Sequence, residues 1–322
     1  MAFISYLDFV DLWFKLRERG TAYAAKKLIS TNESRIKSTW EEDELPSSNW
    51  WQVDAVRQRW NELITGNKST IYPDYVVQKW LTNQSNLNML SIGCGTGQRE
   101  IEFALHPCFN KIDAFDIAQK AIDDANKTAL EKGLKNCNFF VGNVYKDQWP
   151  NEAYDVVLFH SSLHHFKNIN NILQKVKNTL KPNGIVIINE YVGANRFQFT
   201  PSRKKYVDKQ YKTIVPVGFK TRKNTTAIKH KVYFPGYLRM VISDPSEAVE
   251  SETILPLMQA NFTLLAQKNY GGNLLTFILK DIAHHFNNPA SHKILLQLFE
   301  IENKLMEEEQ QSDFVFAIYK KQ

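Results

Sequence analysis

Leu90-Ser91-Ile92-Gly93-Cys94-Gly95-Thr96-Gly97 joins a short apolar run to three alternating glycines. The apolar run predicts a buried strand, and the polar residues after Gly97 predict the start of a helix. Glycine lacks a Cβ atom, so its backbone adopts a positive φ easily and a ligand can lie directly against it. The segment therefore predicts a ligand-binding turn at the carboxyl edge of a sheet, where open α/β sheets bind their ligands.

An acidic residue, Asp116, ends the next apolar run, Ile112-Asp113-Ala114-Phe115-Asp116. A carboxylate at the end of the second strand of a doubly wound sheet can accept two hydrogen bonds from ribose hydroxyls. The glycine spacing is Gly-x-Gly-x-Gly, and Gln98 stands where a dinucleotide-binding loop would carry its third glycine. The pattern favours a nucleoside-containing cofactor that is not a dinucleotide. A purely structural turn is the alternative.

From Asn88 onward, short apolar runs alternate with amphipathic stretches, as in parallel sheets whose strands are joined by helices. We expect strands at about 88–92, 111–116, 137–141, 154–160, 184–190, 262–266 and 314–319. Helices are expected at about 98–106, 118–132, 168–180, 244–260, 273–286 and 291–309. Asp244 would cap the fourth of these helices, with Pro245 in its first turn. The predicted fold class is α/β, with a doubly wound, mostly parallel sheet of seven strands.

Two further regions extend this pattern. Residues 1–85 predict an N-terminal helical cap, with helices at about 6–17, 22–28, 54–63 and 73–81 and an acidic linker at about 31–48. Residues from about 195 to 243 predict an irregular basic lid, inserted after the fifth strand of the main domain, 86–322.

Composition narrows the class of protein. The chain has 322 residues, 43% of them apolar, and a formal net charge of +6, as in globular proteins with an ample core. Its three cysteines lack CxxC spacing, which argues against a disulfide framework and a zinc site and favours a reducing compartment, the cytoplasm. No apolar stretch is long enough to span a membrane, and Asp8 and Asp11 stand where a signal peptide would be basic.

Ten lysines and arginines lie between Arg203 and Lys231, where Asp208 is the one acidic residue. Such a cluster can attract a phosphate, a carboxylate or a nucleic acid, and a solvated lid surface is the alternative. An anion clamp would draw on Arg203, Lys204, Lys205, Arg222 and Lys223.

From about Asn88 to Tyr191 the chain resembles class I S-adenosylmethionine-dependent methyltransferases of the small-molecule type. The resemblance rests on the loop that ends at Gly97 and on Phe140-Val141-Gly142-Asn143-Val144, where the family usually has Asp before an apolar residue. It implies a Rossmann-like methyltransferase fold and S-adenosyl-L-methionine as the cofactor. The cofactor-binding residues that it implies are Ser91, Gly93, Cys94, Gly95, Gly97, Asp116, Ile117, Asn143, Val144 and His160.

In the family pattern, the glycine turn lies against the methionine part of the cofactor, Asp116 holds the ribose and Ile117 lies beside the adenine. The amide oxygen of Asn143 can accept a hydrogen bond from the adenine amino group. One position departs from the family, because Ser91 stands where an acid commonly organises the ammonium group. Glu100 is a candidate to compensate, although the helix macrodipole also explains an acid in that first helical turn.

The loop after the fourth predicted strand is His160-Ser161-Ser162-Leu163-His164-His165-Phe166, and its Leu-His-His-Phe string resembles one in many small-molecule methyltransferases. Methyl transfer from a sulfonium is an in-line displacement, so a hydroxyl acceptor must be aligned and deprotonated, a task that suits an imidazole. We expect His164 or His165 to contact the substrate or take the proton, with Glu190 as a third catalytic candidate. Packed or capping histidines are the alternative.

Tyr191 and Arg196 are candidate substrate-binding residues. In the alternative, Tyr191 packs under the lid and Glu190 pairs with Arg196. The aromatic residues Trp50, Trp51 and Trp60 either roof the acceptor pocket or pack against the sheet.

The sequence thus predicts an enzyme that methylates oxygen or nitrogen of a small-molecule acceptor, such as an anionic compound, a sugar, a lipid head group or a secondary metabolite. The alternatives are an RNA or tRNA methyltransferase and a non-catalytic protein that keeps the fold. We find no recognisable RNA-binding module, and no Asn/Asp-Pro-Pro-aromatic motif follows the fourth strand. No metal ion is expected, because no clustered carboxylates are visible near the predicted site.

Overall fold

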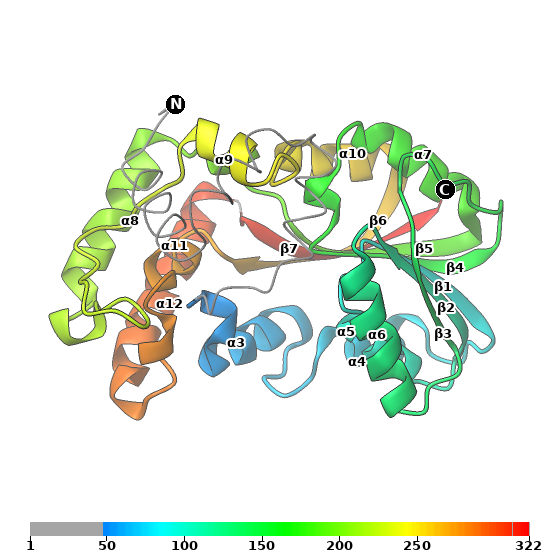
Figure 1. Ribbon diagram of the computed structural model, residues 1–322, viewed down its shortest axis with the longest axis horizontal. Coiled ribbons are helices and arrows are strands. Elements are labelled where there is room, and N and C mark those ends of the chain that lie inside the picture. Colours follow the sequence, from blue (N-terminus) through cyan, green and yellow to red (C-terminus); the bar gives the residue numbers. More distant parts are fainter. Residues whose placement is uncertain (1–47, 311, 322) are drawn as a thin grey trace.

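The computed structural model describes residues 48–310 and 312–321. Its centre is a seven-stranded sheet with the strand order β3-β2-β1-β4-β5-β7-β6 (Figure 1). The strands are β1 (Leu87–Ile92), β2 (Phe109–Asp116), β3 (Cys137–Val141), β4 (Tyr154–His160), β5 (Leu180–Tyr191), β6 (Phe262–Gly271) and β7 (Phe314–Lys321). Neighbouring strands are parallel except at β7, which runs antiparallel to β5 and β6. The predicted fold class is confirmed.

The strand order reverses between β1 and β4, because the chain moves outward from β1 to β3 and then returns to the other side of β1. At such a switch point the loops that follow the two strands diverge and leave a crevice at the carboxyl edge of the sheet. The glycine turn after β1 and the histidine loop after β4 therefore border the same space.

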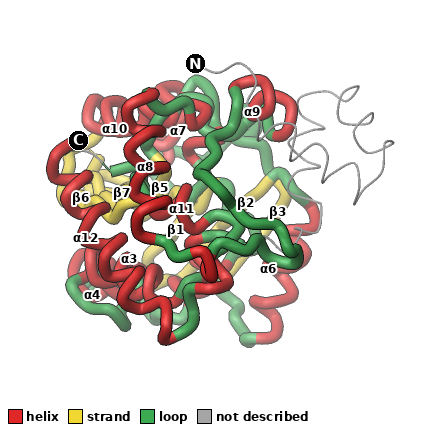
Figure 2. The backbone as a smooth tube through the Cα atoms, turned by 90° about the vertical axis from the view of Figure 1, so that its left-hand side faces the viewer, coloured by secondary structure: helices red, strands yellow, loops and turns green. Residues whose placement is uncertain are grey.

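Helices cover both faces of the sheet (Figures 1 and 2). One face packs against α4 (Tyr72–Trp80), α5 (Gln98–Ala104) and α6 (Gln119–Glu131), and the other against α7 (Ile169–Thr179) and α10 (Ile254–Asn261). Alternation along β4 divides its side chains, since Val156 and Leu158 join the first core and Val157 and Phe159 the second. Burial on both faces explains why Val156 to Phe159 form a continuous apolar run in the sequence.

The remaining helices form a lobe toward the left of Figure 1. They are α3 (Asp54–Thr65), α8 (Pro201–Ile214), α9 (Tyr237–Ser243), α11 (Leu275–Leu279) and α12 (His292–Glu309). An apolar core that includes Trp50, Tyr211 and Leu298 holds the lobe together. A buried ion pair, with Arg59 Nη1 2.8 Å from Glu302 Oε2, links α3 to α12.

The described part of the N-terminal cap shares its core with the rest of the chain. Tyr72 and Val76 of α4 are buried in the same cluster as residues of the sheet. The helices expected at about 54–63 and 73–81 correspond to α3 and α4. The helices and the linker that were predicted within residues 1–47 lie outside the described residues.

The expectation that the lid, 195–243, is irregular was wrong, because α8 occupies 14 of its residues. Thr200 caps this helix by accepting a hydrogen bond from the backbone N–H of Arg203 at 3.3 Å, and Pro201 stands in its first turn. Val207 and Tyr211, four positions apart, are buried on one side. The lysines around them masked this narrow apolar stripe in the sequence.

The helix predicted at 244–260 was also placed wrongly, since α10 begins only at Ile254. The Asp244 carboxylate does not cap a helix. Its Oδ1 accepts hydrogen bonds from the backbone N–H and the hydroxyl of Ser246, at 2.8 and 2.5 Å, and so closes a local turn. This turn carries residues 244–247 to the edge of the sheet.

The helix predicted at 273–286 is interrupted after Leu279, the last residue of α11. The Nζ of Lys229, in the lid, donates hydrogen bonds to the carbonyls of Phe277, Ile278 and Lys280 at 2.8, 3.0 and 2.8 Å. A distant side chain therefore satisfies carbonyls that a continuing helix would have bonded. Burial lowers the pKa of Lys229 to about 7.

Candidate active site

The glycine turn after β1 is held by the neighbouring strand. The backbone N–H groups of Gly93 and Cys94 both donate to the carbonyl of Phe115, at 2.9 and 3.1 Å. Gly95 has a φ of +54°, and a Cβ added there would meet no atom within 4 Å, so its exposed backbone faces open space. This bare backbone is a cradle for a ligand that approaches closely.

Asp116 supports the same turn. Its Oδ2 accepts a hydrogen bond from the Gly95 backbone N–H at 3.0 Å, and its Oδ1 accepts one from the Ala118 N–H at 2.9 Å. A carboxylate offers about four lone-pair directions, so two remain for a ligand's hydroxyls. The structure therefore joins the two sequence motifs, the glycines and the acid, into one unit.

A cavity of about 730 Å³ lies over this unit. Most of the predicted cofactor residues line it, namely Gly93, Cys94, Gly95, Asp116, Ile117, Asn143, Val144 and His160. Residues that the sequence did not single out also line it, including Lys120, Ala121 and Asp124. They carry no spacing signal of their own, because each is brought to the cavity only by the position of its strand, helix or loop. We call this cavity the cofactor chamber.

Asn143 is held by its own loop. Its backbone N–H donates to Asp147 Oδ2 at 2.6 Å, and its side-chain Oδ1 accepts from the Tyr145 backbone N–H at 2.9 Å. An amide oxygen has two lone pairs, so one remains for the hydrogen bond that the family resemblance implies.

Two predicted cofactor residues, Ser91 and Gly97, lie behind the chamber rather than in its wall. The Ser91 hydroxyl donates to Glu100 Oε1 at 2.5 Å, and both side chains are buried. Burial raises the pKa of Glu100 to about 7. Ser91 and Glu100 therefore pair with each other beneath the turn. Gly97 makes room for the Phe139 ring, which lies 2.5 Å from where its Cβ would be.

The histidine loop after β4 is organised by Glu190, near the end of β5. Its Oε1 accepts the backbone N–H groups of Ser162 and Leu163 at 2.6 and 2.8 Å, and its Oε2 accepts Nδ1–H of His164 at 2.7 Å. Glu190 is fully buried. It therefore sets the conformation of the loop and the orientation of His164 from behind.

The pKa values of the two adjacent histidines, His164 and His165, are shifted in opposite directions. Burial by itself would lower the pKa of His164, but Glu190, and then Glu247 and Asp244, raise it above the ordinary value. Burial, followed by the charge of His164, lowers the pKa of His165. Burial also lowers the pKa of His160 to about 3, so this side chain is neutral at pH 7.

A second and larger cavity, of about 1130 Å³, adjoins the first. Its walls are rich in aromatic rings: Trp50, Trp51, Trp60, Tyr72, Tyr191, Phe197, Tyr233, Tyr270, Phe277 and Phe314. The two cavities share part of their lining: Gln98, Arg99, His160, Ser161, His165, Asp244 and Glu247. We call the second cavity the aromatic chamber and these seven residues the junction.

The two predicted substrate-binding residues differ in position. Tyr191 lines the aromatic chamber, is 2% exposed, and donates its hydroxyl to the Ala194 carbonyl at 2.9 Å. Arg196 lies outside both chambers, where its guanidinium donates to the carbonyls of Asp244, Pro245 and Glu247 at 3.3, 2.7 and 3.0 Å. Arg196 thus braces the 244–247 turn and does not pair with Glu190.

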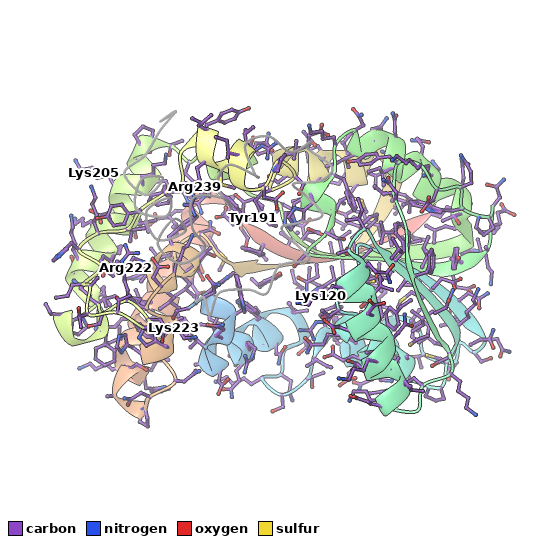
Figure 3. All side chains as sticks on the ribbon, in the orientation of Figure 1. Lys120, Tyr191, Lys205, Arg222, Lys223 and Arg239 are labelled. Carbon is purple, nitrogen blue, oxygen red and sulfur yellow. The ribbon has the colours of Figure 1, made fainter. Side chains whose placement is uncertain are left out.

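Two of the basic lid residues form ion pairs with carboxylates elsewhere in the chain. Arg203 pairs with Asp313 and Arg222 with Asp281, at 2.5 and 2.9 Å. In Figure 3, Lys205, Arg222 and Lys223 lie in the left-hand lobe, whereas Lys120 lies on the opposite side beside the cofactor chamber. The five residues considered for an anion clamp line neither chamber.

A glycine turn, an acid at the end of β2 and a cavity at the switch point together define an α/β enzyme with a nucleoside-containing cofactor. A family model of the methyltransferase domain matches residues 83–275, more than half of the chain. The chain belongs to this family, and it is a class I S-adenosylmethionine-dependent methyltransferase. Within the described residues, no helix combines the length and apolar character needed to cross a bilayer.

The ubiquinone biosynthesis O-methyltransferase of Rickettsia canadensis is 30% identical over 156 residues, 48% of this chain and 62% of that protein. The uncharacterized methyltransferase YcgJ of Bacillus subtilis is 25% identical over 104 residues, 32% of this chain and 40% of that protein. The matched parts thus span less than two thirds of these relatives. A geranyl diphosphate methyltransferase structure in complex with SAM covers 78% of this chain and 84% of its own, with 9% identity and a TM-score of 0.48.

Proposed function

We propose that this chain transfers a methyl group from S-adenosylmethionine to an oxygen atom of a small-molecule acceptor bound in the aromatic chamber. The observation that carries the proposal is the junction, where the two chambers share His160, at the end of β4, and Ser161 and His165, in the loop that follows it. An in-line transfer needs donor and acceptor to meet across such a shared wall. Oxygen is favoured over nitrogen because the Rickettsia relative is named an O-methyltransferase.

The residues of the cofactor chamber fit S-adenosylmethionine. The bare backbone at Gly95 suits the amino-acid part, the two remaining lone-pair directions of Asp116 suit the ribose hydroxyls, and Asn143 and Ile117 suit the adenine. When bound, the cofactor supplies an electrophilic methyl group on its sulfonium.

The aromatic chamber suits an acceptor that is large and mostly apolar but carries hydrogen-bonding groups. Polar atoms of its lining that are buried without a hydrogen-bond partner among the described residues include Trp60 Nε1, Tyr72 Oη, His160 Nδ1 and Thr276 Oγ1. A buried polar group without a partner costs about 1–3 kcal/mol, so these atoms favour a ligand with complementary polar groups. A hydroxylated aromatic compound with an apolar substituent meets both requirements.

At the junction, the acceptor hydroxyl would contact His165 and Glu247, which line both chambers. This cluster of imidazole and carboxylate groups can favour the loss of the hydroxyl proton. Glu190 takes part only as a positioning residue, because it is buried and acts through His164 and the loop backbone.

The first test is calorimetric titration of the purified protein with S-adenosylmethionine, with S-adenosylhomocysteine and with NAD. We expect both adenosyl ligands to bind and NAD not to bind. Asp116→Ala should weaken binding at least about tenfold, because hydrogen bonds to a charged group contribute about 1.5–3 kcal/mol each. Asp123→Ala, on the exposed side of α6, is the matched control and should bind normally. A folded wild-type protein that binds neither adenosyl ligand would overturn the proposal.

The second test follows methyl transfer to a panel of hydroxylated arenes and arylamines, read as S-adenosylhomocysteine release and product mass. We expect methyl ethers from the hydroxylated arenes. Products formed only from arylamines would instead assign the enzyme to nitrogen.

A further inference from the structure

The turn at residues 244–247 brings two carboxylates to the paired histidines of the junction. Glu247 Oε1 lies 3.7 Å from His164 Nε2, and Glu247 Oε2 lies 4.0 Å from His165 Nε2. Asp244 Oδ2 lies 4.0 Å from His165 Nδ1. Within residues 48–310 and 312–321, His164, His165 and Glu247 are the one group of three or more His, Cys, Asp or Glu residues whose ligand atoms all lie within 4.8 Å of one another.

We propose that His164, His165 and Glu247 form a binding site for one divalent transition-metal ion, such as Zn²⁺ or Co²⁺, with Asp244 as an adjacent carboxylate. Two imidazoles and a carboxylate are a donor set that suits these ions. Hard ions such as Mg²⁺ prefer sites made of oxygen atoms alone, so they should bind more weakly here.

The groups behind the ligands have the arrangement of a metal site's outer shell. Glu190 accepts the Nδ1–H of His164, which fixes the ring so that Nε2 faces Glu247. The hydroxyl oxygen of Ser246 lies 3.2 Å from Nδ1 of His165, and Nε2 of the same ring faces Glu247. Metal-bound histidines commonly hold their second ring nitrogen in such a hydrogen bond, which sets the tautomer and orientation.

The separations are near those that a metal requires. Bonds of about 2.0–2.1 Å at tetrahedral angles place neighbouring ligand atoms about 3.4 Å apart. The two distances to Glu247, 3.7 and 4.0 Å, need only small side-chain rotations to reach that value. Glu247 is partly exposed at the mouth of the cluster, with 24% of its side chain accessible, so it can move and an ion can enter.

The charges around the two histidines also favour the binding of a cation. Three carboxylates, those of Glu190, Glu247 and Asp244, surround two imidazoles. The Arg196 guanidinium is near, but it bonds backbone carbonyls of the 244–247 turn. An ion placed between the histidines and Glu247 would therefore sit in a field of net negative charge.

The place of the ion in the reaction rests on the proposed function. His165 and Glu247 line both chambers, so the ion would lie at the junction with its open positions toward the acceptor. A cation there would favour the ionised form of an acceptor hydroxyl. The binding site itself does not depend on this role.

The test is titration of tag-free, chelator-treated protein with Co²⁺ alone, followed by visible absorption and calorimetry, without cofactor or acceptor. We expect one Co²⁺ ion to bind per chain and to show d–d absorption bands typical of coordination that includes nitrogen. Added Zn²⁺ should displace the Co²⁺. Glu247→Gln and, separately, His165→Gln should each weaken Co²⁺ binding at least tenfold.

His284 and His285 offer a matched control pair. Their ring centroids lie 4.0 Å apart, against 4.2 Å for His164 and His165, but no carboxylate joins them in a comparable group among the described residues. His285→Gln should leave Co²⁺ binding unchanged. The proposal is overturned if wild-type protein binds no stoichiometric Co²⁺, or if the Glu247 and His165 variants, shown to be folded by circular dichroism, bind it as wild type does. Because the readout needs no cofactor, it remains decisive even if methyl transfer is not observed.

Discussion

The cofactor chamber takes nearly all of its walls from residues 93–166, whereas the aromatic chamber draws on segments from Asn49 to Phe314. The first is built from loops at the ends of four consecutive strands. The second is built where the N-terminal cap, the lid and the last helices meet. In this fold the cofactor site is thus local in sequence, and the acceptor site depends on how distant segments pack.

The two chambers also differ in how their polar groups are satisfied. In the cofactor chamber, Asp116 and Asn143 already hold the loop backbone that they support. In the aromatic chamber, the polar atoms of Trp60, Tyr72 and Thr276 are buried without hydrogen bonds among the described residues. The first chamber is therefore largely preformed by its own hydrogen bonds, and the second retains unmet hydrogen bonds that an acceptor can complete.

The largest expected effect comes from Gly97→Ala in the glycine turn. Gly97 has a φ of +72°, and an added Cβ would lie 2.5 Å from the Phe139 ring. A left-handed backbone and an overpacked neighbour together should cost about 2–5 kcal/mol of folding free energy. Denaturant unfolding measures the loss, and calorimetry should show weaker S-adenosylmethionine binding.

Substitutions at two other glycines separate the cost of the left-handed backbone from the cost of overpacking and from the loss of cofactor contact. Gly133→Ala, at a φ of +67° with no atom within 4 Å of the added Cβ, should lose only about 1–2 kcal/mol and keep cofactor affinity. Gly95→Ala should lose cofactor affinity more than stability, because its Cβ would enter the chamber. Equal losses of affinity in all three variants would contradict the local character of this site.

An intermediate effect is expected from Glu100→Gln beneath the turn. Burial raises the pKa of Glu100 from the ordinary 4.5 of a glutamate to about 7 in the folded protein, so the folded state retains a proton that the unfolded state releases between these pH values. Wild-type stability should therefore fall as pH rises from about 4.5 to 7, by up to about 3 kcal/mol.

Glutamine cannot ionise, so the stability of Glu100→Gln relative to wild type should be greater at pH 8 than at pH 5. Denaturant unfolding at both pH values checks this difference. A stability difference that is the same at pH 5 and pH 8 would show that Glu100 is not the group responsible.

The smallest expected effect tests the aromatic chamber. Thr276→Val removes a buried hydroxyl that has no partner among the described residues, so it should stabilise the acceptor-free protein by about 1 kcal/mol. Thr179→Val is the matched control, because the Thr179 hydroxyl donates to the Pro150 carbonyl at 2.5 Å and its loss should destabilise the protein by about 1 kcal/mol. Both should bind S-adenosylmethionine normally. Destabilisation of both alike would mean that the Thr276 hydroxyl is satisfied in solution.

Sequence patterns predicted the sheet and the helices α3 and α12 well, and the lid and the helices between residues 244 and 286 poorly. All seven predicted strands are present, and the central strands β1, β4 and β5 are apolar runs with both faces buried along most of their length. The predicted helix boundaries were wrong where another hydrogen bond, distant or local, competes with the continuation of the helix. Lys229 donates hydrogen bonds to carbonyls at the end of α11, and Asp244 accepts hydrogen bonds from Ser246 instead of capping a helix.

The linear order of residues was enough to place the glycine turn, Asp116 and the Leu-His-His-Phe loop, because each is a short motif at the end of a strand and parallel strands end at one edge. Only the folded structure showed that Glu247 approaches His164 and His165. It also showed that Glu190 points inward to His164 and that Arg196 lies outside the site. These contacts join groups far apart in the chain, such as His165 and Ser246, which are 81 positions apart. Packing creates such contacts, and no local periodicity records them.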